Sequence, residues 1–149
     1  MGSAAGSNTY AVTVTADDGA NTTDQMITIT VTDENEAPTA VVLTNTVASV
    51  DENTVGDLKV ADVAVTDDAM GTNDLTLSGA DAGDFELRAG GTELWFTGGA
   101  QNFEMPADAD MLSDFDVTVV VDDTSVAGTP DATADLTLTV NDVNDAPEV

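Results

Sequence analysis

A short polar segment that ends in proline occurs twice in this chain. The two copies are Asp33-Glu34-Asn35-Glu36-Ala37-Pro38 and Asp142-Val143-Asn144-Asp145-Ala146-Pro147. Each copy follows a run in which apolar residues and threonines alternate, at 26–31 and at 136–140, as in a β-strand with one buried face. Proline has no N–H to continue a strand pairing, so each copy ends a strand. The two copies therefore predict linkers on either side of one folded module.

The residues ahead of each linker repeat as well. In the first copy, a strand pattern at 10–16 is followed by the turn signal Asp17-Asp18-Gly19 and then by the strand at 26–31. In the second, a strand pattern at 115–121 is followed by Asp122-Asp123, a longer loop and a strand at 134–140. This internal repeat predicts that residues 8–33 form a hairpin from the last two strands of a truncated preceding repeat.

Between the linkers, short strand patterns follow one another with turn residues between them, and no stretch has a helical period. The expected strands are a broken first strand at 41–43 and 47–50, followed by 58–66, 75–78, 85–87, 93–97, 115–121 and 134–140. Seven short strands in about 100 residues predict an all-β chain with a seven-stranded antiparallel Greek-key sandwich. The expected organisation is a tag or linker remnant at 1–7, the hairpin at 8–33, a linker at 34–38, a complete domain at 39–142 and the start of the next linker at 143–149.

Each linker carries three oxygen-bearing side chains within four positions, which suits a hard cation with oxygen ligands. The chain has no Cys and no His, which excludes the usual zinc, copper and haem sites. Both linkers resemble the calcium-binding linker of cadherin-type domains, and the chain is most similar to the cadherin-like repeats of large bacterial surface proteins. The first linker departs from the family by having Glu36 where the second has Asp145. The resemblance implies a cadherin or immunoglobulin-like sandwich that binds Ca²⁺.

The resemblance also implies two sets of calcium ligands, one at each end of the module. Asn102 stands where the family has an aspartate, and Asp68 substitutes for a family position that is lost at residue 69. Because successive strand residues face opposite sides, one aspartate of each Asp-Asp pair is expected to point into a site, and we favour Asp67 and Asp123. The set at the start of the module is Asp33, Asn35, Glu36, Asp67, Asp68 and Asp123, and the set at its end is Glu52, Asn102, Glu104, Asp142, Asn144 and Asp145.

The charge of the chain limits its partners. Two basic residues, Lys59 and Arg88, stand against 29 acidic ones, for a net charge of −27. Nucleic acid and anionic membrane surfaces are therefore excluded as partners, and no apolar run is long enough for membrane insertion. Two explanations of the acidity stay open: bound cations that neutralise carboxylates, or an acidic surface adapted to salt.

Three classes of function are compatible with these patterns. The first is a structural and adhesive spacer of an extracellular or cell-surface protein, with neighbouring repeats of the same chain as partners and homophilic contacts as an option. The second is a carbohydrate-binding module, based on Trp95, which strand alternation places on the face opposite Leu94 and Phe96. The third is an enzyme, which the lack of His, Cys and a glycine-rich phosphate loop disfavours, and we expect no enzyme. The spacer is the favoured prediction.

Overall fold

The computed structural model describes residues 8–68, 70–109 and 111–145. The predicted remnant at 1–7 and the last residues of the second linker, 146–149, lie outside them. The chain divides into two compact units, Met1–Glu34 and Asn35–Val149. All regular elements in the described ranges are β-strands, apart from two short 3₁₀ turns, which confirms the prediction of an all-β chain. Within those ranges no helix has the length and apolar character that crossing a membrane requires.

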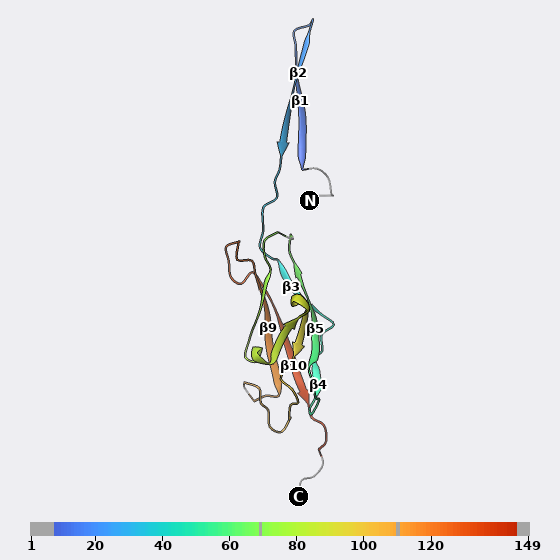
Figure 1. The fold of residues 1–149 in the computed structure, drawn as a ribbon, viewed down its shortest axis with the longest axis vertical. Coiled ribbons are helices and arrows are strands. Elements are labelled where there is room, and N and C mark those ends of the chain that lie inside the picture. Colours follow the sequence, from blue (N-terminus) through green and yellow to red (C-terminus); the bar gives the residue numbers. More distant parts are fainter. Residues whose placement is uncertain (1–7, 69, 110, 146–149) are drawn as a thin grey trace. The chain divides into compact units, whose positions relative to one another are not determined.

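The first unit is a two-stranded antiparallel hairpin of β1 (Thr9–Asp17) and β2 (Thr22–Thr30), seen in Figure 1. The predicted turn joins them. Asp17 Oδ1 accepts a hydrogen bond from the Gly19 N–H at 2.7 Å, and Asp18 Oδ1 accepts bonds from the next two N–H groups. Gly19 has a φ of 87°, which a residue without a Cβ adopts at no steric cost. Aspartate side chains and one glycine thus fix the turn.

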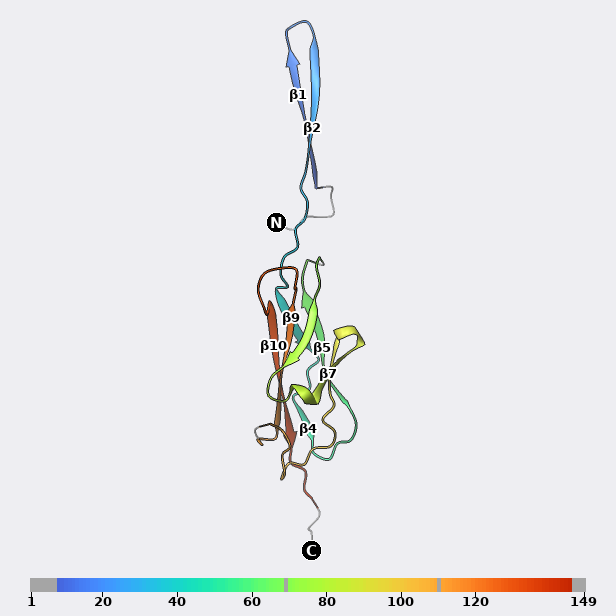
Figure 2. The ribbon, with the colours of Figure 1, turned by 60° about the vertical axis from the view of Figure 1, so that its left-hand side comes forward.

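The second unit contains two four-stranded sheets, visible in Figures 1 and 2. One sheet has the order β4 (Ser49–Asp51), β10 (Ala132–Asn141), β9 (Asp114–Asp122) and β6 (Asp74–Ser78). The other has the order β3 (Ala40–Thr44), β5 (Leu58–Thr66), β8 (Glu93–Phe96) and β7 (Phe85–Arg88). The 3₁₀ turns η1 (Ala82–Asp84) and η2 (Ala89–Gly91) flank β7.

The core lies between these two sheets. Every second residue of β9 is buried, as is every second residue of β10 from Leu136 onward, and the intervening residues are more exposed, as strand alternation predicts. Phe96 of β8 sits at the centre, with its ring edge-on to Phe115 of β9 at 4.8 Å and to Phe85 of β7 at 5.4 Å between centroids. One hydrophobic cluster therefore joins the two sheets, an arrangement consistent with a β-sandwich.

The broken first strand connects the two sheets. Its first piece, β3, pairs antiparallel with β5, whereas its second piece, β4, pairs parallel with β10. The sequence pattern predicted antiparallel pairing throughout, so this pair is a correction. The chain keeps its direction through the break, where Asn45 has a φ of 50°, and β4 therefore runs alongside β10 in the same direction.

Candidate metal centres

The predicted ligands of the second unit gather at its two ends. Strands β5 and β9 both end where the chain enters the unit at Asn35, and β4 and β10 both end where it leaves. We call the residues Asn35, Asp67, Asp68 and Asp123 the entry cluster, and the residues Glu52, Glu104 and Asp145 the exit cluster. Each cluster combines a linker residue with residues from the loops of the sandwich.

The exit cluster consists of three carboxylates that converge. One oxygen from each of Glu52, Glu104 and Asp145 lies within 4.8 Å of the others. Glu52 is buried with 4% of its surface exposed, and the other two are exposed. At this spacing three negative charges repel one another unless a proton or a cation lies between them.

Glu52 is the fixed member of the exit cluster. Its Oε2 accepts a hydrogen bond from the Phe103 N–H at 2.9 Å, and its Oε1 accepts one from the Val143 N–H at 2.8 Å. These two backbone bonds, with a smaller contribution from Glu104, lower the pKa of Glu52 below its usual value. One carboxylate thus holds a sandwich loop and the second linker together, and it does so in its ionised form.

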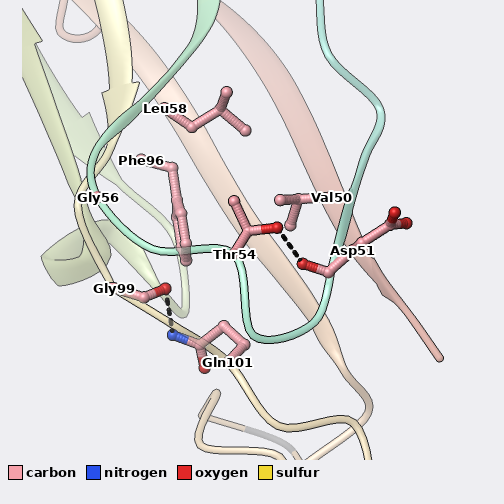
Figure 3. Close-up of a pocket in the computed structure, with 8 residues that line it drawn as sticks. All are labelled: Val50, Asp51, Thr54, Gly56, Leu58, Phe96, Gly99 and Gln101. Atoms are coloured by element: carbon pink, nitrogen blue, oxygen red, sulfur yellow. Dashed lines mark hydrogen bonds between the residues drawn. The ribbon is translucent and has the colours of Figure 1, made fainter. Parts of the chain in front are cut away.

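The loop that carries Glu104 is held next to Glu52 by backbone contacts. The Asn53 N–H donates to the Gln101 carbonyl at 2.9 Å, and the Gln101 side chain in turn donates to the Gly98 carbonyl. Figure 3 shows the cavity beneath these loops, with Phe96 and Leu58 among its lining residues. Its volume of about 10 Å³ has room for roughly one water molecule and for no larger ligand.

The three other residues predicted for this end make local contacts or are exposed. Asn102 Oδ1 accepts a hydrogen bond from the Met105 N–H at 2.8 Å, so this side chain caps a local turn. Asn144 Nδ2 donates to the Asp145 carbonyl at 3.2 Å, and Asp142 is exposed. The structure therefore brings together three of the six residues expected at the end of the module.

Asp123 is the centre of the entry cluster and has no exposed surface. Its Oδ2 accepts a hydrogen bond from Asn35 Nδ2 at 2.9 Å. Its Oδ1 accepts two from Ser125, from Oγ at 2.6 Å and from N–H at 2.9 Å. The Ser125 hydroxyl, followed by Asn35 and the Ser125 N–H, lowers the pKa of Asp123 to about 2. The buried carboxylate is therefore ionised at neutral pH.

Two acceptor oxygens of the entry cluster lack a hydrogen-bond donor. Asn35 Oδ1 and Asp67 Oδ1 are fully buried and have no hydrogen-bond partner among the described residues. The second oxygen of Asp67 does have one, because it accepts a bond from Asn73 Nδ2 at 2.9 Å. A buried acceptor without a donor costs free energy that a bound cation would offset. These two buried oxygens are available to a cation, whereas among the described residues the carboxylates that converge within 4.8 Å are those of the exit cluster.

The loop between β5 and β6 closes over these side chains. Asp68 Oδ1 accepts from the Met70 N–H at 2.7 Å and its Oδ2 from the Glu36 N–H at 3.3 Å, which lower the pKa of Asp68, the Met70 bond most. Gly71 has a φ of 69°, and a Cβ there would lie 1.9 Å from Asp123 Oδ2. Only glycine permits this approach.

Sequence reasoning missed three residues of the entry region: Gly71, Asn73 and Ser125. Ser125 had a local signal, since a Ser two positions after an Asp is typical of a turn closed by the Asp side chain. No local sequence pattern marked Gly71 or Asn73 as part of a site. Of the predicted residues, Glu36 is exposed and contributes its N–H here, while Asp33 belongs to the first unit, where it is exposed.

Both basic residues of the chain are engaged away from the two clusters. Lys59 forms ion pairs with Asp62 at 2.6 Å and Glu93 at 2.8 Å. Arg88 forms ion pairs with Asp57 and Glu86. The chain has no other Lys or Arg, so a positive charge that neutralises either cluster has to come from solution.

Trp95 is part of the same ionic network. The Arg88 guanidinium lies over its ring, 5.0 Å from the centroid, and the indole Nε1 donates to Glu93 Oε2 at 3.0 Å. One face of the ring and its polar group are therefore occupied by protein. Such a contact is a stabilising cation–π interaction.

The donor atoms of both clusters are carboxylate and amide oxygens, which fit a hard cation such as Ca²⁺ or Mg²⁺. Glu52 and Asp123 would hold an ion as fixed, ionised ligands, whereas the exposed Glu104 and Asp145 would adjust to it. Neither a protein-family model, nor a curated protein, nor a solved structure matches this chain.

Proposed function

We propose that this chain is a calcium-binding structural and adhesive spacer module of an extracellular, multi-repeat surface protein. In this proposal the second unit is a cadherin-like, seven-stranded Greek-key sandwich, in which β3 and β4 together count as the broken first strand. The single observation that carries the proposal is the composition of the two clusters. Each joins a linker residue, Asn35 or Asp145, to sandwich carboxylates, Asp123 or Glu52.

A cation in such a cluster would limit the motion of the linker. Without the ion, the exit carboxylates repel one another, and this repulsion favours conformations in which Asp145 moves away from Glu52 and Glu104. With the ion, the same oxygens become ligands, and the linker is tied to the sandwich. The partners of the module are then the neighbouring repeats of the same polypeptide, which this coupling would hold as a stiff array.

We assign the ion as Ca²⁺ on the geometry of the ligands. Ca²⁺ accepts 6–8 oxygens in irregular arrangements, whereas Mg²⁺ requires an octahedron and gives up its water reluctantly. The clusters combine a buried aspartate, an amide oxygen and exposed carboxylates. These donors come from three separate chain segments, which suits the more permissive ion.

A titration with Ca²⁺, followed by thermal melting and by NMR of the backbone amides, tests the proposal. Ca²⁺ at a hundredfold excess over Kd is expected to stabilise the fold by about 2.7 kcal/mol. The amides of Phe103, Val143 and Ser125, which donate to the ligand carboxylates, should shift most. Mg²⁺ and KCl at matched ionic strength are the controls. Equal stabilisation by all three salts would mean general charge screening and would exclude specific sites.

The carbohydrate-binding alternative receives no support from a specific contact. A sugar platform needs an open aromatic face, and Arg88 lies over the ring of Trp95, the only tryptophan. The cavity in Figure 3 is too small for a sugar ring, and the larger hollow of about 340 Å³ over β9 and β10 has no aromatic residue in its lining. The spacer is therefore the function that we propose.

A further inference from the structure

The hairpin of the first unit has one apolar face. Tyr10, Val12 and Val14 of β1 lie on it, with Ile27 and Ile29 of β2 directly opposite Val12 and Tyr10. Their exposed fractions range from 47% for Ile27 to 63% for Tyr10. The other face is mostly threonine. The face therefore has the apolar composition of a buried core surface, but its side chains are exposed to solvent.

The second unit contains the same hairpin in a covered state. Strands β9 and β10 pair in the register of β1 and β2, so that residues aligned in the internal repeat also occupy equivalent places in the pairing. In β9 and β10 these residues are at most 8% exposed. The equivalent pairs are Tyr10–Ile29 with Phe115–Leu138, and Val12–Ile27 with Val117–Leu136.

The second unit also shows what covers such a hairpin. The apolar face of β9 and β10 packs on the sheet β3-β5-β8-β7, through contacts such as Phe115 with Phe96. The outer edge of β9 is paired with β6, and that of β10 with β4. The covering sheet and both edge strands come from residues 39–113. The complement of this hairpin is therefore one contiguous segment of sheet-forming chain.

We infer that the apolar face and the two edges of β1–β2 are a docking surface for a β-sheet segment with the chemistry of residues 39–113. Such a segment would bury Val12 and Ile29 and pair with both free edges, which closes a second sandwich. The inference deepens the proposed function, because it rests on the repeat organisation proposed above. It does not depend on bound ions, since the contacts involved are apolar and backbone ones.

The size of the hairpin excludes a second hairpin as a sufficient partner. Each strand has nine residues, so at about 3.4 Å per residue the face is roughly 30 Å long, and two strands are roughly 10 Å wide. Face-to-face packing would bury roughly 300 Å² per partner, against about 800 Å² in a standard stable interface. It would also leave every edge unpaired. A partner that adds a covering sheet and edge strands would bury a larger area and would pair the edges.

A fusion protein tests this inference. A second copy of residues 39–113 is joined directly to Thr9, the position that corresponds to Asp114, and the rest of the chain is kept. Hydrogen exchange of the Val12, Ile27 and Ile29 amides should slow by at least roughly 100-fold relative to the unfused chain, towards the rates of β9 and β10. The matched control carries Phe96→Asp in the added copy only. In this control the hairpin amides should exchange as fast as in the unfused chain.

The remaining outcomes also decide the matter. If the added copy folds while the hairpin amides exchange as before, the inference is wrong. If the added copy stays unfolded, it is wrong too, because the hairpin should complete it. Concentration-dependent protection of the hairpin in the unfused chain, with a dimer in sedimentation, would assign the surface to a second copy instead. Repeating the exchange in Ca²⁺ and in EDTA, with the second unit's amides as a folding reference, separates this result from a failure of ion binding.

Discussion

Asn35 Nδ2 donates a hydrogen bond to Asp123 Oδ2 at 2.9 Å, although 88 positions separate these residues in the chain. The bond fixes the first linker to the end of β9, and the amide oxygen of Asn35, Oδ1, has no hydrogen-bond donor among the described residues. One short side chain therefore links the first linker directly to the buried carboxylate of the entry cluster.

The first prediction is that Asn35→Ala lowers the melting temperature of the second unit by about 5 °C, because Asp123 loses one of its donors. The same variant should bind Ca²⁺ more weakly, since the unpartnered amide oxygen is lost as a ligand. Thermal melts in EDTA and in Ca²⁺ measure both effects. Thr124→Ala, in the exposed turn next to Asp123, is the matched control and should change neither. Unaltered calcium binding in Asn35→Ala would remove this residue from the site.

The second prediction concerns Glu104→Gln and has opposite signs with and without the ion. In EDTA the variant should be slightly more stable than the natural chain, because one of three converging charges is removed. In the presence of Ca²⁺ its Kd should rise, roughly tenfold, because a charged ligand is lost. Calorimetric titration and urea unfolding measure the two effects. Asp24→Asn, in the hairpin, serves as the control, and a Glu104→Gln protein with unchanged Kd would contradict the exit site.

The third prediction follows from the pKa of Asp123, which its hydrogen bonds lower to about 2. A carboxyl group whose pKa is lower in the folded state than in the unfolded state, where it is about 3.9, stabilises the fold above that value. This contribution is lost as the pH falls from about 4 towards 2. The stability difference between the natural chain and Asp123→Asn should therefore shrink over this window in EDTA.

Urea unfolding at pH 5 and at pH 2.5 measures that difference. Asp74→Asn, an exposed aspartate at the start of β6, is the comparison variant. A stability gap between the natural chain and Asp123→Asn that stays constant between the two pH values would show that the carboxylate has an ordinary pKa.

The fourth prediction compares two glycines with positive φ. Gly71→Ala should destabilise the second unit by clearly more than Gly56→Ala. An added Cβ at Gly71 would meet Asp123 and Asn35, whereas an added Cβ at Gly56 has no other atom within 4 Å. Both changes carry a left-handed backbone cost of roughly 1–2 kcal/mol, so the excess in Gly71→Ala reports the clash. Urea unfolding in EDTA supplies the comparison. Equal losses would mean that the loop after β5 does not press on the entry cluster.

Much of the fold could be predicted because alternation is a local signal. Val117, Val119 and Val121 alternate with polar or half-buried residues in β9, and strand and face follow from that period alone. The parallel pairing of β4 with β10 could not be predicted, because it depends on which sheet the second piece of a broken strand joins. Three residues of sequence carry no information on that choice.

For the candidate sites too, the local features could be predicted from the sequence, and the features that depend on the folded chain could not. The oxygen-rich linkers are visible in the sequence, and the resemblance to cadherin-type domains supplied their partners Glu52 and Glu104. The sequence pattern does not show that Asn102 caps a turn, because an asparagine occurs both in turn caps and in metal sites. Gly71 was missed for a related reason. Its role comes from a side chain 52 positions away that only the folded chain brings near.

The parallel pairing of β4 with β10 determines how the second unit carries mechanical load. The chain enters at the end that holds Asn35 and leaves at the other end beyond Asn141, while β4 belongs to the entering strand and β10 is the leaving one. Tension on the two ends therefore pulls these neighbours past each other. Their three paired positions, Ser49 to Asp51 with Thr139 to Asn141, are strained together instead of being opened one at a time. We expect single-molecule stretching to show one abrupt force peak, and Val50→Pro, which removes a donor from this pair, to lower it.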